Sequence, residues 1–219
     1  ASTTLTLKDV SIRIPTGKLT LVVGPVGSGK STLLAALLKE LQPTAGQVAM
    51  PTDRVSYAAQ SPYLVNASIE ENIVFGGTRD ISRLRKVIAS CELQSDLDML
   101  PDGIRTELGE NGINLSGGQK QRVSIARAAY PANQQLYIFD DALSALDAKV
   151  STSIFQRSFS ESPGALLAGK TRVLATHSLQ FAKSAQWIIV MDKMRVVQMG
   201  TYEELTKHQP NGALAKMLE

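Results

Sequence analysis

The stretch Gly24-Pro25-Val26-Gly27-Ser28-Gly29-Lys30-Ser31-Thr32 decides the fold that we expect for this chain. It matches the pattern G-x-x-x-x-G-K-[ST], in which small residues let backbone N–H groups surround a phosphate while a lysine neutralises its outer oxygens. Residues 18–23 before it read as a buried strand, and residues 33–38 after it read as a helix. A helix N-terminus then directs its partial positive charge at the anion. The sequence therefore predicts an α/β fold with a phosphate-binding loop.

Composition limits the class of protein further. The 219 residues are enough for one domain with a sizeable core, and a net charge of +3 is too small to predict a nucleic-acid partner. The single cysteine, Cys91, excludes an internal disulfide, and we interpret it as a packed helical residue. No apolar run is long enough to cross a bilayer, and the N-terminus lacks a signal-peptide pattern. These features favour a soluble chain.

The spacing of apolar residues predicts further strands and helices. Residues 5–14 alternate apolar and polar ahead of a Pro-Thr-Gly turn, which predicts a β-hairpin edge. Short strands are expected at 47–50 and 54–57, and helices with polar turns between about residues 63 and 110. The later strands are expected at residues 136–141, 170–176, 187–191 and 195–199, ahead of a closing helix from Tyr202.

Polar side chains follow several of these strands. Asp140 and Asp141 end the predicted strand 136–141, His177 follows 170–176, and Gln60 follows 54–57. Ligands of open α/β folds bind at the carboxyl edge of the sheet, and Mg²⁺ prefers oxygen ligands. The run Ser116-Gly117-Gly118 opens a further helix and offers N–H groups and a hydroxyl to phosphate oxygens, although such a run is also a common helix cap.

These elements in this order resemble the nucleotide-binding domain of an ABC transporter over essentially the whole chain. The motifs that carry the resemblance are a Walker A loop at residues 24–32, a Q-loop glutamine at Gln60, a Leu-Ser-Gly-Gly-Gln signature at 115–119, a Walker B strand at 136–140, a D-loop at 144–147 and a switch histidine at His177. Walker A alone names a superfamily. The signature between Walker A and Walker B is close to diagnostic.

Further stretches resemble one branch of the family. Residues 63–76 and 106–110 are similar to exporter-type domains, in which this region touches the coupling helices of the membrane subunit. The string 110–122, with 139–141 and 169–177, is most similar to the first nucleotide-binding domain of the multidrug-resistance-protein (C) subfamily. Members of that subfamily export organic anions and conjugates or act as channel regulators.

The resemblance implies an architecture and a setting for residues 1–219. It implies a P-loop NTPase core with a predominantly parallel sheet, a small antiparallel β subdomain, and an α-helical subdomain at about 63–120 that bears the signature. It also implies a second nucleotide-binding domain as head-to-tail partner, and transmembrane domains reached through coupling helices at the cytoplasmic face of a membrane. Family members stack adenine on an upstream aromatic residue, whereas the first aromatic here is Tyr57. We therefore expect an N-terminally truncated fragment of a larger membrane protein, soluble by itself and weak in ATP binding.

The resemblance also implies a role for each candidate residue, with ATP and Mg²⁺ as cofactors. The ATP phosphates are expected to contact Gly24, Pro25, Val26, Gly27, Ser28, Gly29, Lys30, Ser31, Thr32, Gln60 and His177. The metal is expected at Ser31, Gln60 and Asp140, and the catalytic residues are expected to be Asp141, His177, Gln60 and Lys30. The partner domain's ATP is expected to be contacted in trans by Ser116, Gly117, Gly118, Gln119 and Asp147.

One position departs from the family pattern. ABC ATPases that turn over quickly carry glutamate directly after the Walker B aspartate, whereas this chain has Asp141. A general base must lie within roughly 3 Å of the water that it activates, and the shorter side chain withdraws the carboxylate. We therefore expect this site to bind ATP and cleave it slowly.

Two alternative functions are a regulatory nucleotide-sensing module and a soluble ABC ATPase of DNA repair or translation. The modest charge and the absence of long coiled-coil insertions disfavour the soluble ATPase.

Overall fold

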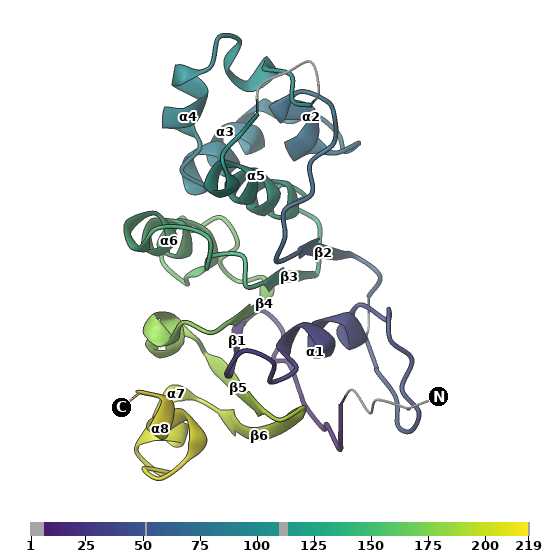
Figure 1. Ribbon diagram of the computed structural model, residues 1–219, viewed down its shortest axis with the longest axis vertical. Coiled ribbons are helices and arrows are strands. Elements are labelled where there is room, and N and C mark those ends of the chain that lie inside the picture. The colour runs from purple at the N-terminus through teal and green to yellow at the C-terminus, as the bar shows by residue number, and fades with distance from the viewer. Residues whose placement is uncertain (1–6, 51, 110–113, 219) are drawn as a thin grey trace.

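The structure is a computed structural model that describes residues 7–50, 52–109 and 114–218. Its centre is a six-stranded sheet in the order β2-β3-β4-β1-β5-β6, in which only β6 runs antiparallel to its neighbour (Figure 1). The strands are β1 (Leu19–Val23), β2 (Val55–Ala58), β3 (Leu136–Asp140), β4 (Thr171–Thr176), β5 (Trp187–Asp192) and β6 (Arg195–Gly200). The predicted α/β class with a predominantly parallel sheet is therefore confirmed.

Helices surround this sheet and extend beyond its β2–β3 side. They are α1 (Lys30–Leu37), α2 (Ile69–Val74), α3 (Ile81–Ser90), α4 (Gln94–Met99), α5 (Gly117–Ala129), α6 (Ala148–Ile154), α7 (Tyr202–Thr206) and α8 (Ala213–Leu218), with short helical turns η1 (Gly103–Arg105), η2 (Phe155–Phe159) and η3 (Leu179–Ser184). Figure 1 shows α2 to α5 together at one end of the molecule and α7 and α8 at the other. Within the described ranges, no helix has both the length and the apolar character to cross a membrane.

Side chains of the central strands are buried on both faces of the sheet. Successive residues of a strand point to opposite faces, so one strand supplies two cores. Val22 of β1 packs with Leu33, Leu34 and Leu37 of α1. Its neighbours on β1 pack in the other cluster, which holds the buried side chains of α6, η2 and the helices α2 to α5. Both cores consequently hold β1, and with it the start of the loop that follows at residue 24.

The helices between β2 and β3 form a lobe joined to the sheet by α5. Ser68 caps α2 in a capping box with Glu71. Leu84, Val87 and Ile88 of α3 are buried, and so is Cys91 after the helix; burial raises the pKa of the Cys91 thiol to about 12. Helix α5 packs against α2 and α3 and also against β2 and β3. The structure thus has no break at residue 120, and a separate subdomain over 63–120 stays a prediction.

Two predicted strands are not formed. Residues 7–14, the described part of the predicted hairpin edge at 5–14, and residues 47–50 lie outside the sheet ladders. The Lys8 N–H donates to the Met194 carbonyl at 3.1 Å, but a single bond does not make a strand pair. The alternation itself is real, since Val10, Ile12 and Ile14 pack against the α1 core. The alternation of apolar residues therefore predicted which side of this segment is buried. A β-strand also needs a hydrogen-bonded neighbouring strand, which this segment lacks in the described residues. The antiparallel pairing of the sheet is that of β5 with β6.

A buried arginine fastens β4 to the end of the α6–η2 helical run. Arg172 is fully buried, and its Nη1 donates to the carbonyl oxygens of Phe159 at 2.8 Å and Ser160 at 3.2 Å. Its Nη2 pairs with Glu161. The last carbonyls of a helix lack intrahelical partners, and a cation is favourable there. Arg172 thus satisfies groups that would otherwise be buried without a donor.

We predict that Arg172→Met lowers the free energy of unfolding by about 2–3 kcal/mol, because the two carbonyl oxygens lose a charged donor inside the protein. Equilibrium urea unfolding measures the change. Arg157→Met is the control, since the Arg157 side chain is 57% exposed and its pairing with Glu92 is worth about 0–1 kcal/mol. Equal midpoints for Arg172→Met and the wild type would contradict the assigned role.

Candidate functional site

The loop between β1 and α1 has the geometry of a phosphate cradle. Gly29 precedes α1 with φ of 103°, a left-handed conformation that favours glycine, and the first turn of α1 has no side-chain cap. A Cβ atom at Gly24 would collide with the carbonyl oxygen of Met191. The loop therefore depends on glycine at both ends. It leaves the first N–H groups of α1 without a capping side chain, as an anion site requires.

Lys30 is folded back over this loop. Its Nζ donates to the carbonyl oxygens of Gly24 at 2.8 Å and Pro25 at 3.0 Å. Burial lowers the pKa of Lys30, and the carboxylates Asp141 and Asp140 partly oppose that shift. The ammonium group thus lies between the loop carbonyls and two acids, where an anionic ligand would meet it.

Parallel pairing brings the remaining candidates to the same edge. Val23 at the end of β1 lies opposite Thr176, and Asp140 at the end of β3 lies opposite Ala175. A cleft of about 190 Å³ opens where these strands end. Its lining consists of Val26, Gly27, Gly29, Lys30, Ser31, Thr32, Gln60, Asp140, Asp141, His177 and Met194. Ten of these eleven residues are among those predicted from the sequence.

Ser31 and Asp140 place two oxygen atoms that can act as metal ligands side by side in the cleft. The Ser31 hydroxyl donates to Asp140 Oδ1 at 3.1 Å, and Asp140 is only 4% exposed. Burial raises the pKa of Asp140, and so does the charge of Asp141; the Ser31 hydrogen bond and Lys30 oppose the shift. No group of three or more His, Cys, Asp or Glu suited to a metal occurs in the described part of the chain. A hydroxyl, a carboxylate and the Gln60 amide nevertheless fit Mg²⁺, which usually retains waters and takes phosphate oxygens.

Asp141 and His177 lie next to each other in the lining of the cleft. His177 Nδ1 lies 3.2 Å from each carboxylate oxygen of Asp141, and the imidazole is the more exposed partner. Asp141 has φ of 46°, a left-handed conformation that aspartate tolerates better than most residues. Its N–H donates to the Ala175 carbonyl, and its carbonyl accepts from Ser144. The turn after β3 thus fixes the direction of this carboxylate.

The structure does not bring all predicted residues to the cleft. Gly24, Pro25 and Ser28 belong to the loop but do not line the cleft, and Ser28 is buried. Ser116, Gly117, Gly118 and Gln119 open α5 in the helical lobe, and Asp147 caps α6 by accepting from the Lys149 and Val150 N–H groups. Ser116 and Gln119 form a capping box, and a Cβ at Gly117 would meet no atom within 4 Å. The α5 N-terminus is thus open on this side.

Sequence reasoning missed one residue of the cleft. Met194 lies in the turn between β5 and β6, and its N–H donates to the Ser28 carbonyl at 3.0 Å. Lys193 and Met194 are both left-handed, with φ of 46° and 63°. No motif marks this turn, because only the pairing of β1 with β5 brings it to the loop.

Sequence reasoning also missed the contacts that hold the segment after Gln60. Asn72 is fully buried, and its side chain accepts from the Val65 N–H and donates to the Val65 carbonyl. Arg127 of α5 donates to the Tyr63 carbonyl at 2.7 Å and to Asn72 Oδ1 at 2.6 Å. The chain that leaves Gln60 is therefore tied to the same helix that begins at Ser116.

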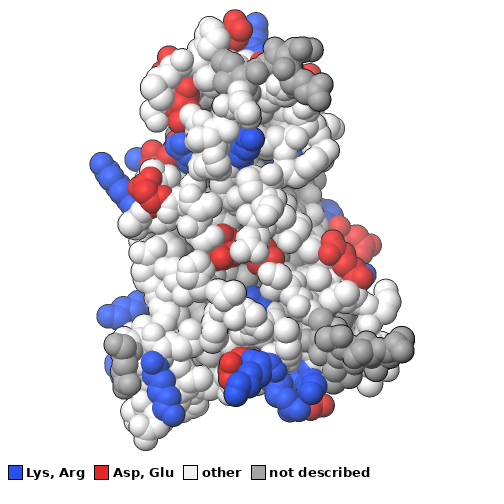
Figure 2. Space-filling model, viewed as in Figure 1, with Lys and Arg blue, Asp and Glu red and all other residues white. Residues whose placement is uncertain are grey.

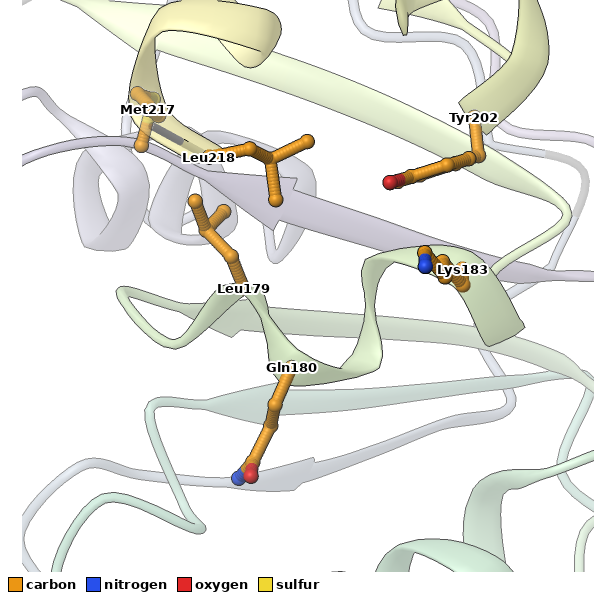
Figure 3. A pocket seen from close by; sticks show the side chains of 6 residues that line it. All are labelled: Leu179, Gln180, Lys183, Tyr202, Met217 and Leu218. Carbon is orange, nitrogen blue, oxygen red and sulfur yellow. The ribbon is translucent and has the colours of Figure 1, made fainter.

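A second, larger cavity lies away from these residues. It has a volume of about 370 Å³ and lies between η3 and the helices α7 and α8 (Figure 3). Its lining consists of Leu179, Gln180, Lys183, Tyr202, Met217 and Leu218. None of these is a predicted site residue. We therefore place the candidate site at the phosphate loop.

A parallel α/β sheet with a phosphate loop, two acids and a histidine at its carboxyl edge defines a P-loop nucleotide-binding domain. The chain belongs to the ABC transporter family, whose pattern matches residues 7–144. It is 46% identical over 93% of its length to ABC transporter C family member 7 of Dictyostelium discoideum. It is 44% identical over 97% to ATP-binding cassette sub-family C member 3 of Rattus norvegicus and 46% identical over 93% to multidrug resistance protein mrp-7 of Caenorhabditis elegans. The chain spans only 13 to 15% of the length of these relatives.

We predict that Asp140→Asn stabilises the chain without nucleotide at neutral pH. The raised pKa means that folding disfavours the ionised carboxyl, so the wild type loses stability as the pH rises through that pKa. The amide does not titrate. Below about pH 3.9, the ordinary aspartate pKa, both side chains are uncharged and the difference should disappear.

Urea unfolding of both proteins from about pH 4 to about pH 7 measures this difference. Asp53→Asn is the control, because the Asp53 side chain is 99% exposed and should show no such gain. A wild type more stable than Asp140→Asn at neutral pH would contradict the predicted sign.

Proposed function

We propose that this chain is the ATP-binding and ATP-cleaving domain of an ABC exporter, which couples both steps to transport through a head-to-tail pair of such domains. One observation carries the proposal: the phosphate loop, the Ser31–Asp140 pair and the Asp141–His177 pair face a single cleft. Gln60 lines it as well. The names of the relatives support the wider assignment, since they are an ABC transporter C family member, an ATP-binding cassette sub-family C member and a multidrug resistance protein.

Binding would be divided among the loop and the edge of the sheet. Lys30 would exchange its loop carbonyls for oxygens of the β- and γ-phosphates, and Thr32 with the loop N–H groups would bind the inner phosphates. Ser31, Asp140 and Gln60 would hold Mg²⁺, which when bound neutralises the phosphate oxygens. The raised pKa of Asp140 agrees with this role, because burial disfavours the charge of the carboxylate and a bound cation would offset that cost.

Hydrolysis would depend on Asp141 and His177. Water attacks the γ-phosphate in line, and a carboxylate within hydrogen-bond reach must orient it and take its proton. His177 holds Asp141 from one side and would contact the γ-phosphate. Because aspartate is one methylene shorter than glutamate, the water would be held at a poorer distance. We propose slow cleavage at this site for that reason.

The signature would serve a second nucleotide-binding domain. Ser116, Gly118 and Gln119 do not line the cleft of their own chain, yet the first turn of α5 is open at Gly117. Figure 2 shows Asp and Glu side chains at the centre and the right edge of this face, and Lys and Arg side chains gathered toward its lower end. The open first turn of α5 therefore supports the proposed contact with ATP of the partner domain.

The helical lobe would contact transmembrane domains at the cytoplasmic face of a membrane. Tyr63 is 72% exposed and Phe75 is 55% exposed, and Arg127 stacks over the Phe75 ring. Exposed aromatic residues are favoured at protein interfaces. This surface therefore supports the coupling-helix contact that the resemblance implies.

A regulatory nucleotide sensor is the second candidate, and Asp141 favours it. Such a module needs the same cleft but no rapid turnover. Measured turnover of the assembled protein separates the two candidates.

We predict that Asp141→Glu raises the steady-state ATPase rate of the site, by about tenfold to a hundredfold, because the longer side chain reaches the attacking water. The measurement uses the complete protein with both nucleotide-binding domains. Asp141→Asn is the control and should lower the rate. Equal rates for aspartate and glutamate would contradict the explanation.

We predict that Ser116→Arg abolishes the ATPase activity of the complete protein but leaves ATP binding to this domain intact, because the arginine would fill the α5 N-terminus and not the cleft. Ser82→Arg is the matched control, since Ser82 is exposed on α3 in the same lobe. Retained turnover in Ser116→Arg would overturn the role of the signature, and lost ATP binding would overturn its separation from the cleft.

A further inference from the structure

The first turn of α5 is closed on itself by two hydrogen bonds. The Gln119 N–H donates to the Ser116 hydroxyl at 3.3 Å, and the Ser116 N–H donates to Gln119 Oε1 at 2.8 Å. The hydroxyl thus acts as an acceptor in this capping box, and its own proton has no acceptor among the described residues. The position of the hydroxyl oxygen therefore depends on where Gln119 holds the turn.

A carboxylate from another helix holds the far end of the Gln119 side chain. Asp96 lies in the first turn of α4 and is 7% exposed. Its Oδ1 accepts from Gln119 Nε2 at 3.0 Å. The Gln119 amide is consequently fixed at both ends, by the Ser116 N–H at its oxygen and by Asp96 at its nitrogen. An amide held in this way cannot turn over without losing both bonds.

Arg122 holds Asp96 in turn. Its Nη1 lies 2.8 Å from Asp96 Oδ2, and its Nη2 donates to Asp96 Oδ1 at 3.1 Å. The guanidinium also donates to the Glu92 carbonyl and, at 3.4 Å, to the Gly118 carbonyl. Both side chains are largely buried, and a buried carboxylate is stable only with such charged and hydrogen-bonded partners. The carboxylate of Asp96 is therefore held in one position by Arg122 and Gln119.

We propose that Asp96 is a positioning residue for the signature. It acts through Gln119 and keeps the Ser116 hydroxyl and the first N–H groups of α5 directed outward. The inference rests on the proposed function, in which those groups contact ATP of the partner domain. No motif marks Asp96, which precedes Gln119 by 23 residues in the sequence.

A purely structural role must be separated from this one, because the Asp96–Arg122 pair also joins α4 to α5. A structural role would act on the stability of the whole lobe. A positioning role would act on turnover through Gln119 and would vanish once Gln119 is removed.

A double-mutant cycle on the complete protein separates the two roles. Asp96→Ala should lower ATP turnover by about tenfold, as expected for a small misplacement of contacting groups. Gln119→Ala should lower it similarly, and the double variant should be no slower than Gln119→Ala. Additive losses would overturn the inference. Asp80→Ala is the control: it removes the cap of α3 in the same lobe, where Asp80 accepts from the Arg83 N–H, and should leave turnover unchanged.

A second measurement does not depend on turnover. In nuclear magnetic resonance spectra of the chain, the Gln119 side-chain NH₂ protons should exchange with solvent at least about tenfold faster in Asp96→Ala, since they lose their acceptor. The Asn72 side-chain protons are the internal reference. Unchanged Gln119 exchange would overturn the inference about Asp96, whereas full turnover in Ser116→Arg would overturn the proposed function instead.

Discussion

The strands β3, β4 and β1 end in register at the carboxyl edge of the sheet, and the site depends on this constraint. Parallel pairing places Asp140 opposite Ala175 and Val23 opposite Thr176, so whatever follows each strand enters the same space. Cores on both faces of the sheet hold β1 in that register. A one-residue slip of β3 would turn Asp140 away from Ser31 and bury it in the core. The arrangement of the residues in the cleft is therefore maintained only as long as the register of the sheet is maintained.

Much of the cleft could be predicted because its residues lie in short motifs next to strands. The loop at 24–29 and His177 each directly follow a predicted strand, and Asp140 lies at the end of one, so parallel pairing brings all three to the same edge of the sheet. Met194 and Asp96 could not be predicted, since each reaches its partner only through the tertiary fold. The strands expected at 5–14, of which the structure describes 7–14, and at 47–50 are not formed for a related reason. Alternation of apolar and polar residues predicts which side of a segment is buried, whereas strand pairing depends on a neighbour elsewhere in the chain.

The segment after Gln60 and the signature are attached to one helix. Arg127 near the end of α5 binds Tyr63 and Asn72, while Ser116 caps its start. The same helix packs on β2 and β3. If α5 moved relative to the sheet, the segment after Gln60 would move with its C-terminal end, and Ser116 would move with its N-terminal end.

Lys30 keeps the loop in shape before any ligand arrives. Its two bonds to the Gly24 and Pro25 carbonyls order the backbone that an incoming anion would otherwise have to arrange. Binding then costs little conformational entropy, because the receptor is already organised. On binding, the Lys30 ammonium group would exchange the Gly24 and Pro25 carbonyls for oxygens of the anion, and it would not have to move in from solvent. Such an arrangement favours rapid capture of the anion.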